Sequence, residues 1–191
     1  KTFYYLCILA LPICFGVTLL AHRIIIFIYK EQFSESAIAL QILVWVSIFL
    51  FLNYLMGYLL NAINLQKVFT IITFIGAITN VILNLILIPI YSFKGAAIAT
   101  VITGLLSFIL LYYFLTKNNF KVNLVSILSK PIFASMIMVF FLINFKNMHL
   151  LILVPLSALV YFACLFVIRA VNKEELDIIK NIFKKVKINK K

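Results

Sequence analysis

The sequence predicts an all-α, polytopic membrane protein with about six transmembrane helices and a C-terminal amphipathic helix. Three observations predict this class: 65% of the 191 residues are hydrophobic, only 12% are charged, and the mean hydropathy is +1.19. Soluble domains are about half apolar and about a quarter charged. The apolar excess therefore has to face lipid, where backbone polar groups must be satisfied internally, so the spans must be helices.

Long stretches without Asp, Glu, Lys or Arg mark the spans. They cover 2–22, 36–66, 68–93, 95–116 and 147–168. Each exceeds the roughly 20 residues that cross a hydrocarbon core. The uncharged stretch 131–145 is shorter, and it reaches spanning length when extended back to 126, with Lys130 snorkelling to the interface and Pro131 in the first turn. We therefore predict one transmembrane portion, 1–171, with spans at about 3–21, 37–60, 68–90, 96–115, 126–145 and 150–170.

Two of these boundaries depend on local residues. After the first span and Arg23, the apolar residues 24–29 are too few to cross again. They either extend the first span or form a short interfacial helix. Pro89 is expected to end the third span, because proline cannot continue the hydrogen-bonding ladder of a helix, and 91–95 then form a tight turn.

Residues 172–191 differ from the rest and form a basic amphipathic segment. Asn172 can cap a helix, and Glu175 completes a pattern like a capping box. Apolar residues follow at spacings of three and four, and lysines fill the other face, among them Lys180, Lys184, Lys185 and Lys187. Such a helix is expected to lie on a membrane surface and to be attracted to anionic lipid.

The basic residues predict the orientation. The chain carries 17 Lys and Arg against 5 acidic residues, a net charge of +12. With six spans, most basic residues fall on the side that holds both termini, and the tail supplies most of this bias. Because cytoplasmic loops carry the excess of Lys and Arg, we predict that both termini are cytoplasmic in a multi-pass protein of the cell membrane. The charge is thus explained by topology, and no nucleic-acid partner is expected.

The sequence contains no pattern for a metal or another cofactor. Cys7, Cys14 and Cys164 lie in apolar spans without paired spacing, so we expect them to be small buried hydrophobic side chains. The chain begins with Lys1 and enters its first span almost at once. We therefore expect it to be the C-terminal part of a longer protein.

The most specific stretch is NVILNLILIPIYSFKGAAIATVIT, residues 80–103. Asn80 and Asn84 lie on one helix face, and Pro89 lies near the membrane surface. The small residues that follow the turn are Gly95, Ala96 and Ala97. Small residues let membrane helices approach closely, so we predict a tightly packed helical hairpin in which both asparagines serve packing.

This stretch resembles the C-terminal domain of polysaccharide-biosynthesis membrane proteins. These are the oligosaccharide flippases of the superfamily that also contains the multidrug and toxic-compound extrusion transporters. Residues 19–43 and 172–183 are similar to two further stretches of the family. The sequence departs from it at Lys30 and Ser92, where the family often has glycine, so we expect stiffer turns or adjusted dihedral angles there.

The resemblance implies a protein with two pseudo-symmetric lobes around a central cavity, of which this chain supplies the last six spans and a missing N-terminal half the rest. It also implies a lipid-linked oligosaccharide as cargo, moved across the cytoplasmic membrane by alternating access, a conformational change rather than bond chemistry. Polar residues in or beside the spans are candidates for the substrate path, namely Arg23, Gln41, Asn53, Asn61 and Asn64. The structural alternative is that the Gln and Asn side chains form hydrogen bonds between helices, and that Arg23 anchors its helix at the membrane surface.

Other functions fit the sequence less well. A multidrug or cation exporter of the same superfamily is the nearest alternative, but such proteins commonly use a carboxylate within the membrane, and the predicted spans contain none. A membrane glycan polymerase or transferase would need clustered acids, bases or a nucleophile, and the loops between the spans offer only Glu31 and Glu35 as acids. A role as a passive scaffold would not explain the specific sequence motif at residues 80–103. We therefore predict a flippase and not an enzyme.

Overall fold

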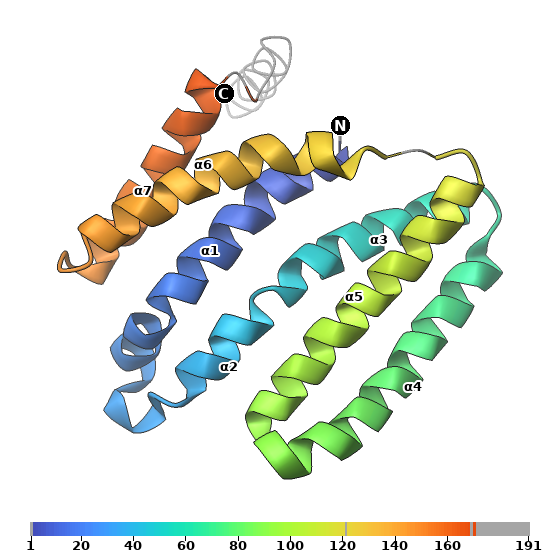
Figure 1. The fold of residues 1–191 in the computed structure, drawn as a ribbon, viewed down its shortest axis with the longest axis horizontal. Helices are drawn as coiled ribbons and strands as arrows, with labels where there is room; N and C mark the ends of the chain where they lie inside the picture. Colours follow the sequence, from blue (N-terminus) through green and yellow to red (C-terminus); the bar gives the residue numbers. More distant parts are fainter. Residues whose placement is uncertain (1, 121, 169, 171–191) are drawn as a thin grey trace, which may run out of the picture.

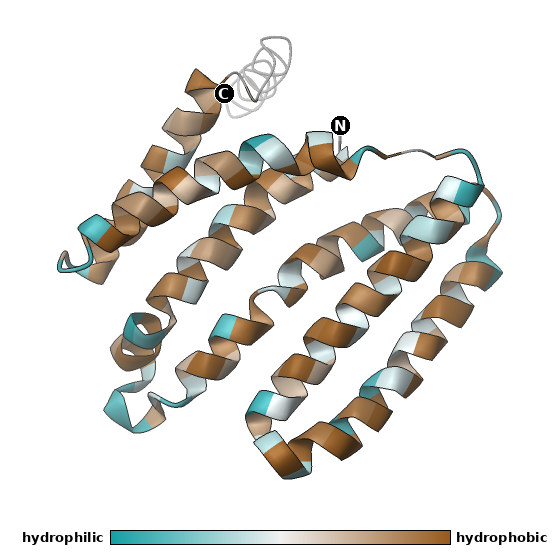
Figure 2. Ribbon diagram, in the orientation of Figure 1, coloured by the Kyte–Doolittle hydropathy of each residue, from teal (hydrophilic) through white to brown (hydrophobic). Residues whose placement is uncertain are grey.

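The computed structural model describes residues 2–120, 122–168 and 170. Six helical segments in this part of the chain are long and apolar enough to cross a membrane, which confirms the predicted fold class. The segments run up and down beside one another (Figure 1). Apolar residues dominate the helices, and polar residues gather mostly where the helices are joined (Figure 2).

Seven α-helices and one 3₁₀ turn make up the described chain. In order they are α1 (Thr2–Tyr29), η1 (Glu31–Phe33), α2 (Ser36–Leu43), α3 (Val46–Ala62), α4 (Gln66–Tyr91), α5 (Phe93–Lys117), α6 (Leu124–Asn144) and α7 (Leu150–Val167). α2 and α3 together form one span, Ser36–Ala62. The second predicted span is therefore correct in extent, but it is interrupted at Val44 and Trp45.

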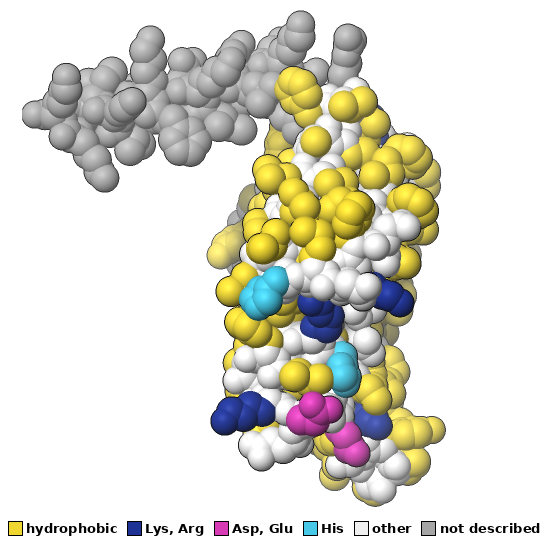
Figure 3. All heavy atoms as spheres, turned by 90° about the vertical axis from the view of Figure 1, so that its left-hand side faces the viewer, with side chains coloured by type: hydrophobic (Ala, Val, Ile, Leu, Met, Phe, Trp, Pro, Cys, Tyr) yellow, Lys and Arg dark blue, Asp and Glu magenta, His cyan; other side chains and the backbone are white. Residues whose placement is uncertain are grey.

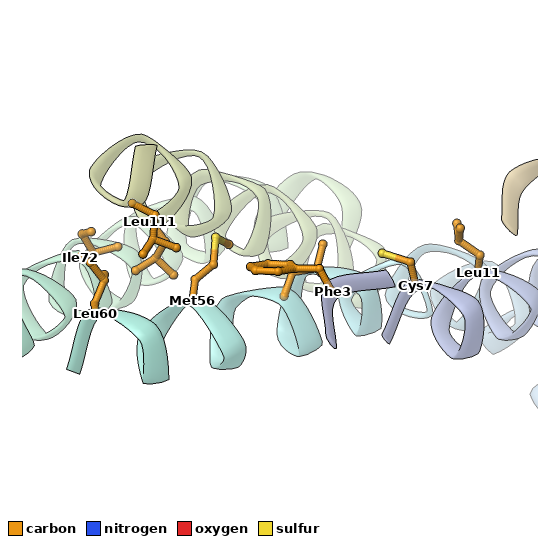
Figure 4. Close-up of a cluster of buried hydrophobic side chains, with 9 residues drawn as sticks. Phe3, Cys7, Leu11, Met56, Leu60, Ile72 and Leu111 are labelled. Atoms are coloured by element: carbon orange, nitrogen blue, oxygen red, sulfur yellow. The ribbon is translucent and has the colours of Figure 1, made fainter. Parts of the chain in front are cut away.

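α1 is the helix that two groups of spans share. On one side it packs with α3, α4 and α5 through a cluster of buried side chains: Phe3, Cys7, Leu11, Leu52, Met56, Leu60, Ile72, Leu111 and Leu115. Figure 4 shows Phe3 of α1 beside Met56 of α3, with Leu60, Ile72 and Leu111 farther along. On the other side α1 packs with α6 and α7, where the buried Tyr161 hydroxyl donates to the Ile8 carbonyl at 2.8 Å. α1 is accordingly the most buried of the six spans and α4 the least.

The first span is longer than expected. α1 continues through His22 and Arg23 to Tyr29 without interruption, so residues 24–29 extend the span and do not form a separate interfacial helix. The helix continues past Arg23, whose guanidinium donates hydrogen bonds to backbone carbonyls of the turn between α6 and α7.

The α4–α5 hairpin is tighter than the sequence indicated. Pro89 lies inside α4 and does not end it, since the helix closes two residues later, with the Ser92 N–H donating to the Ile88 carbonyl at 2.7 Å. Ser92 alone connects the two helices. Gly95 belongs to α5, where a Cβ atom would overlap the carbonyl of Leu87.

α6 begins earlier than predicted. Asn123 caps it by accepting a hydrogen bond from the Ser126 N–H at 3.2 Å, and the helix starts at Leu124. Pro131 therefore lies inside the helix, fully buried, and not in its first turn. α7 ends at Val167, a little before the predicted 170.

Charged side chains mark one end of the bundle. Figure 3, which shows the side of α1, α6 and α7, has acidic, basic and histidine side chains in its lower part below a largely apolar surface. This end carries the α1–α2, α4–α5 and α6–α7 connections, and the N-terminus and the other connections lie at the opposite end (Figure 1). The predicted alternation of loops therefore holds. The predicted basic helix 172–191 lies outside the described residues.

Candidate functional site

A groove between three spans is the candidate site. Its volume is about 540 Å³, with α3 and α4 as walls and α5 as floor. We call it the α3–α5 groove. It is lined by Val46, Leu50, Asn53, Tyr54, Phe69, Ile72, Thr73, Gly76, Ala77, Asn80, Val81, Thr100, Thr103, Gly104, Ser107 and Leu111. Its polar side chains stand within apolar spans, where an unsatisfied polar group is costly and therefore indicates a function.

Asn53 is the residue with unused hydrogen-bonding capacity. Its Nδ2 donates to the Gly104 carbonyl at 3.1 Å, which joins α3 to α5. Its Oδ1 is buried and accepts no hydrogen bond from the described residues. An amide oxygen can accept two hydrogen bonds, so this oxygen, buried in the lining of the groove, keeps unused acceptor capacity.

Asn80 and Asn84 form a short chain of hydrogen bonds. The Asn84 Nδ2 donates to the Asn80 Oδ1 at 2.8 Å, and the Asn80 Nδ2 donates to the Thr103 hydroxyl at 3.2 Å. Asn80 thus connects α4 to α5 while also lining the groove. The Oδ1 of Asn84 is buried and has no partner within the described chain.

Small and hydroxyl-bearing residues shape the floor and one wall. On α4 they are Thr73, Gly76, Ala77 and Asn80, and on α5 they are Thr100, Thr103, Gly104 and Ser107. Each set recurs at i, i+3, i+4 and i+7, the spacing of a single helix face. The sequence prediction missed all of these residues except Asn80, although this spacing could have found them.

The hydroxyl groups of the groove are mostly occupied by their own helices. Thr73 donates to the Phe69 carbonyl at 2.9 Å, Thr100 to the Ala96 carbonyl at 2.8 Å and Thr103 to the Ala99 carbonyl at 3.0 Å. These hydroxyls keep lone pairs that can accept a further hydrogen bond. The groove is thus better equipped to accept hydrogen bonds than to donate them.

Two other predicted path residues lie outside the groove and bind the backbone. Arg23 donates from Nη1 to the Lys146 carbonyl at 2.6 Å and from Nη2 to the Met148 carbonyl at 2.5 Å. The Gln41 Nε2 donates to the Thr18 carbonyl at 3.0 Å. Both side chains fix α1 to a neighbouring segment.

The remaining predicted residues lie near the opposite end or in the hairpin. Asn61 is exposed in the last turn of α3, and Asn64 is exposed in the following turn with a positive φ of 61°. Of the predicted structural residues, Gly95 and Ala97 are buried in α5 and Ala96 is half-buried. The four tail lysines Lys180, Lys184, Lys185 and Lys187 fall outside the described residues.

The described residues offer no set of ligands for a metal. In 2–120, 122–168 and 170, no group of three or more His, Cys, Asp and Glu side chains lies close enough to hold an ion. The three cysteines are free, and Cys7 and Cys14 are buried. The arrangement that remains is an uncharged, mainly apolar groove with amide and hydroxyl side chains in its lining.

Comparison with known proteins agrees with the membrane architecture. No protein-family model matches this chain. Over 117 residues the chain is 33% identical to an uncharacterized membrane protein of Methanocaldococcus jannaschii, a match that covers 61% of this chain and 23% of that protein. This chain is a multi-pass membrane protein. The matched stretch spans about a quarter of the relative's length.

Proposed function

We propose that this chain is part of a flippase that translocates a lipid-linked oligosaccharide across the cytoplasmic membrane by alternating access. The cargo, the membrane lipids and the N-terminal half of the same protein are the proposed partners. Transport of this kind requires two conformations and no bond chemistry, so we do not assign an enzymatic activity. Both termini of the chain are proposed to be cytoplasmic.

The single observation that carries this proposal is the α3–α5 groove with the buried, unsatisfied Asn53 Oδ1 in its lining. The groove lies within spans that otherwise expose apolar side chains to lipid. Polar side chains at membrane depth usually face protein, water or cargo. Sugars carry many hydroxyl groups, and the amide and hydroxyl side chains among the apolar lining of this uncharged groove can match that chemistry.

The α4–α5 hairpin gives a second line of support. Residues 80–103 carry the resemblance to the oligosaccharide flippases, and they also supply four of the sixteen residues that line the groove. Asn80, Thr100 and Thr103 all belong to this stretch and all line the groove. The resemblance and the groove therefore concern the same part of the molecule.

Deletion of the full-length gene in its host tests the proposed function. We expect lipid-linked glycan to accumulate on the cytoplasmic leaflet and surface polysaccharide to be lost, with both restored by the intact gene. Mass spectrometry of the accumulated lipid would identify the cargo. Normal surface glycan together with altered sensitivity to toxic cations would indicate an exporter instead of a flippase. Surface glycan chains that stay short would indicate a polymerase.

Two variants on α3 then test the groove itself. Asn53→Leu removes the acceptor and the bond to Gly104, and we expect it to lower restored surface polysaccharide about tenfold, because a sugar hydroxyl would meet an apolar surface. Asn61→Leu changes the same residue type two turns later on the same helix, outside the groove, and should restore normal levels. Equal activity of the two variants at equal expression would exclude the groove from the cargo path.

A further inference from the structure

The helical hydrogen bonding changes within the span Ser36–Ala62. Val44 and Trp45 separate α2, with eight residues, from α3, with 17, although both keep right-handed helical angles. The Val44 N–H donates to the Leu40 carbonyl at 3.1 Å, whereas the Trp45 N–H donates to the Ile42 carbonyl at 3.3 Å and the Ser47 N–H to the Val44 carbonyl at 3.1 Å. The last two bonds join residues three apart. Such 3₁₀ bonding in the middle of a helix often marks a hinge.

The local sequence does not require this interruption. Helices are usually broken by proline, by glycine, or by a side chain that enters the backbone hydrogen-bonding ladder. Residues 36–56 contain neither proline nor glycine. A side chain from another helix that reaches this backbone is a further kind of cause.

That contact comes from one turn of α1. The Cys14 thiol donates to the Val44 carbonyl at 3.2 Å, a buried interaction. The Gln41 side chain donates to the Thr18 carbonyl at 3.0 Å, which binds α2 to the same turn. The ring of Trp45 packs edge-to-face against Phe15, with 5.3 Å between centroids. All three contacts join α1 to α2 or to the break.

The two helices beside the break are anchored unequally. α3 buries Leu52, Met56 and Leu60 in the cluster that it shares with α1, α4 and α5. α2 packs against α1 and α5 but buries only the small Ala37 fully, in a cluster with Ala21 and Ile25 of α1. α3 is therefore fixed by larger buried side chains than α2, and the thiol of Cys14 at the junction is a poor donor.

We infer that α2 pivots relative to α3 about Val44–Trp45, and that the Cys14–Thr18 turn of α1 holds one of its two positions. The pivot adjoins the α3–α5 groove, because Val46 and Leu50, directly after the break, line that groove. Discontinuous helices beside a binding site are a common device of membrane transporters. The inference concerns the motion of the helix and holds whatever the cargo is.

Distance measurements between spin labels test the pivot in the full-length protein, in lipid nanodiscs, with other cysteines removed. Cys14→Ser retains a hydroxyl that can donate to Val44. One pair of labels, at Ile38→Cys and Tyr58→Cys, spans the break at exposed positions. The control pair, at Phe93→Cys and Tyr113→Cys, lies the same number of residues apart on the unbroken α5, also at exposed positions.

We expect two distances, or a distribution at least twice as wide as the control's, for the pair across the break. A single distribution as narrow as that of α5 would overturn the pivot. Cys14→Ala in place of Cys14→Ser removes the donor to Val44, and should change the ratio of the two populations about two- to fivefold. An unchanged ratio would overturn the role of the α1 turn. The distance measurement does not depend on transport. If the spin labels show two populations but deletion of the gene leaves the surface glycan unchanged, the flippase proposal is rejected and the pivot is retained.

Discussion

Ser92 and Lys30, the two turn residues for which stiffer turns or adjusted dihedral angles were predicted, both have positive φ angles, 53° at Ser92 and 68° at Lys30. Positive φ is a region that glycine enters freely and other residues enter at a cost. The backbone at both positions thus has a geometry suited to glycine, with a larger side chain in place.

Ser92→Gly should stabilise the protein. The Ser92 side chain makes no capping hydrogen bond, so glycine loses no contact and relieves the strain at φ 53°, ψ −138°. We expect a gain of about 0.5–2 kcal/mol in the free energy of unfolding, measured in mixed micelles. Ser34→Gly is the matched control, because Ser34 has ordinary helical angles, and glycine there should stabilise nothing. A gain of equal size at both positions would contradict the strain argument.

Gly95→Ala should destabilise the hairpin. The added Cβ would overlap the backbone carbonyl of Leu87, which cannot move aside as a flexible side chain can. We expect a loss of about 1–3 kcal/mol, typical of overpacking, and a lower Tm in detergent. Gly16→Ala is the control, since its Cβ would meet only the Met138 side chain at 3.7 Å. An unchanged Tm for Gly95→Ala would show that the α4–α5 approach is looser than described.

At the scale of the element, several helix boundaries that the sequence misplaced coincide with a contact from elsewhere or with a cap. Arg23 lies inside α1, and two carbonyls of the α6–α7 turn accept its hydrogen bonds. Cys14 of α1 donates to the Val44 carbonyl at the junction of α2 and α3. α6 starts early because Asn123 caps it. Patterns of charge and apolar length predict that a span exists, and such contacts decide where its helix ends.

Arg23→Lys should weaken the attachment of the α6–α7 hairpin to α1. A lysine keeps the charge but lacks the planar fork that binds two carbonyls at once. We expect a loss of about 1–2 kcal/mol in unfolding free energy. Lys146→Met is the control, because only the backbone carbonyl of Lys146 accepts the bond, and it should leave stability unchanged. Equal stability of Arg23→Lys and the parent protein would show that the clamp contributes nothing.

At the scale of the whole molecule, the described spans form two groups that share α1, and the α3–α5 groove lies on one of them. The connections alternate between two ends, and acidic, basic and histidine side chains gather at the end with the α1–α2 and α6–α7 connections. This arrangement fits a protein held across a bilayer with a polar surface on one group of spans. The predicted orientation can be tested directly.

Single cysteines in the connections should report the orientation of the full-length protein in intact cells. We expect Gln32→Cys and Asn147→Cys to react with an impermeant maleimide from outside. Gln66→Cys and Asn118→Cys should react only after permeabilisation, because their end is proposed to be cytoplasmic. All four positions are exposed in the structure. The reverse labelling pattern would overturn the orientation, and mixed labelling at one end would overturn the alternation.

The sequence by itself determined the class of the protein, the number of spans and the alternation of their connections. These follow from the lengths of the uncharged stretches. In lipid the backbone N–H and C=O groups of each such stretch must hydrogen-bond to one another, and a helix allows this. It also identified Asn53 and Asn80 as polar residues within spans, but it could not separate them from Gln41 and Arg23. Only the tertiary structure decided that Gln41 and Arg23 bind backbone carbonyls while Asn53 lines a groove with its Oδ1 unsatisfied. It alone also placed the α2–α3 junction at Val44 and Trp45, because the contacts there come from residues on another helix.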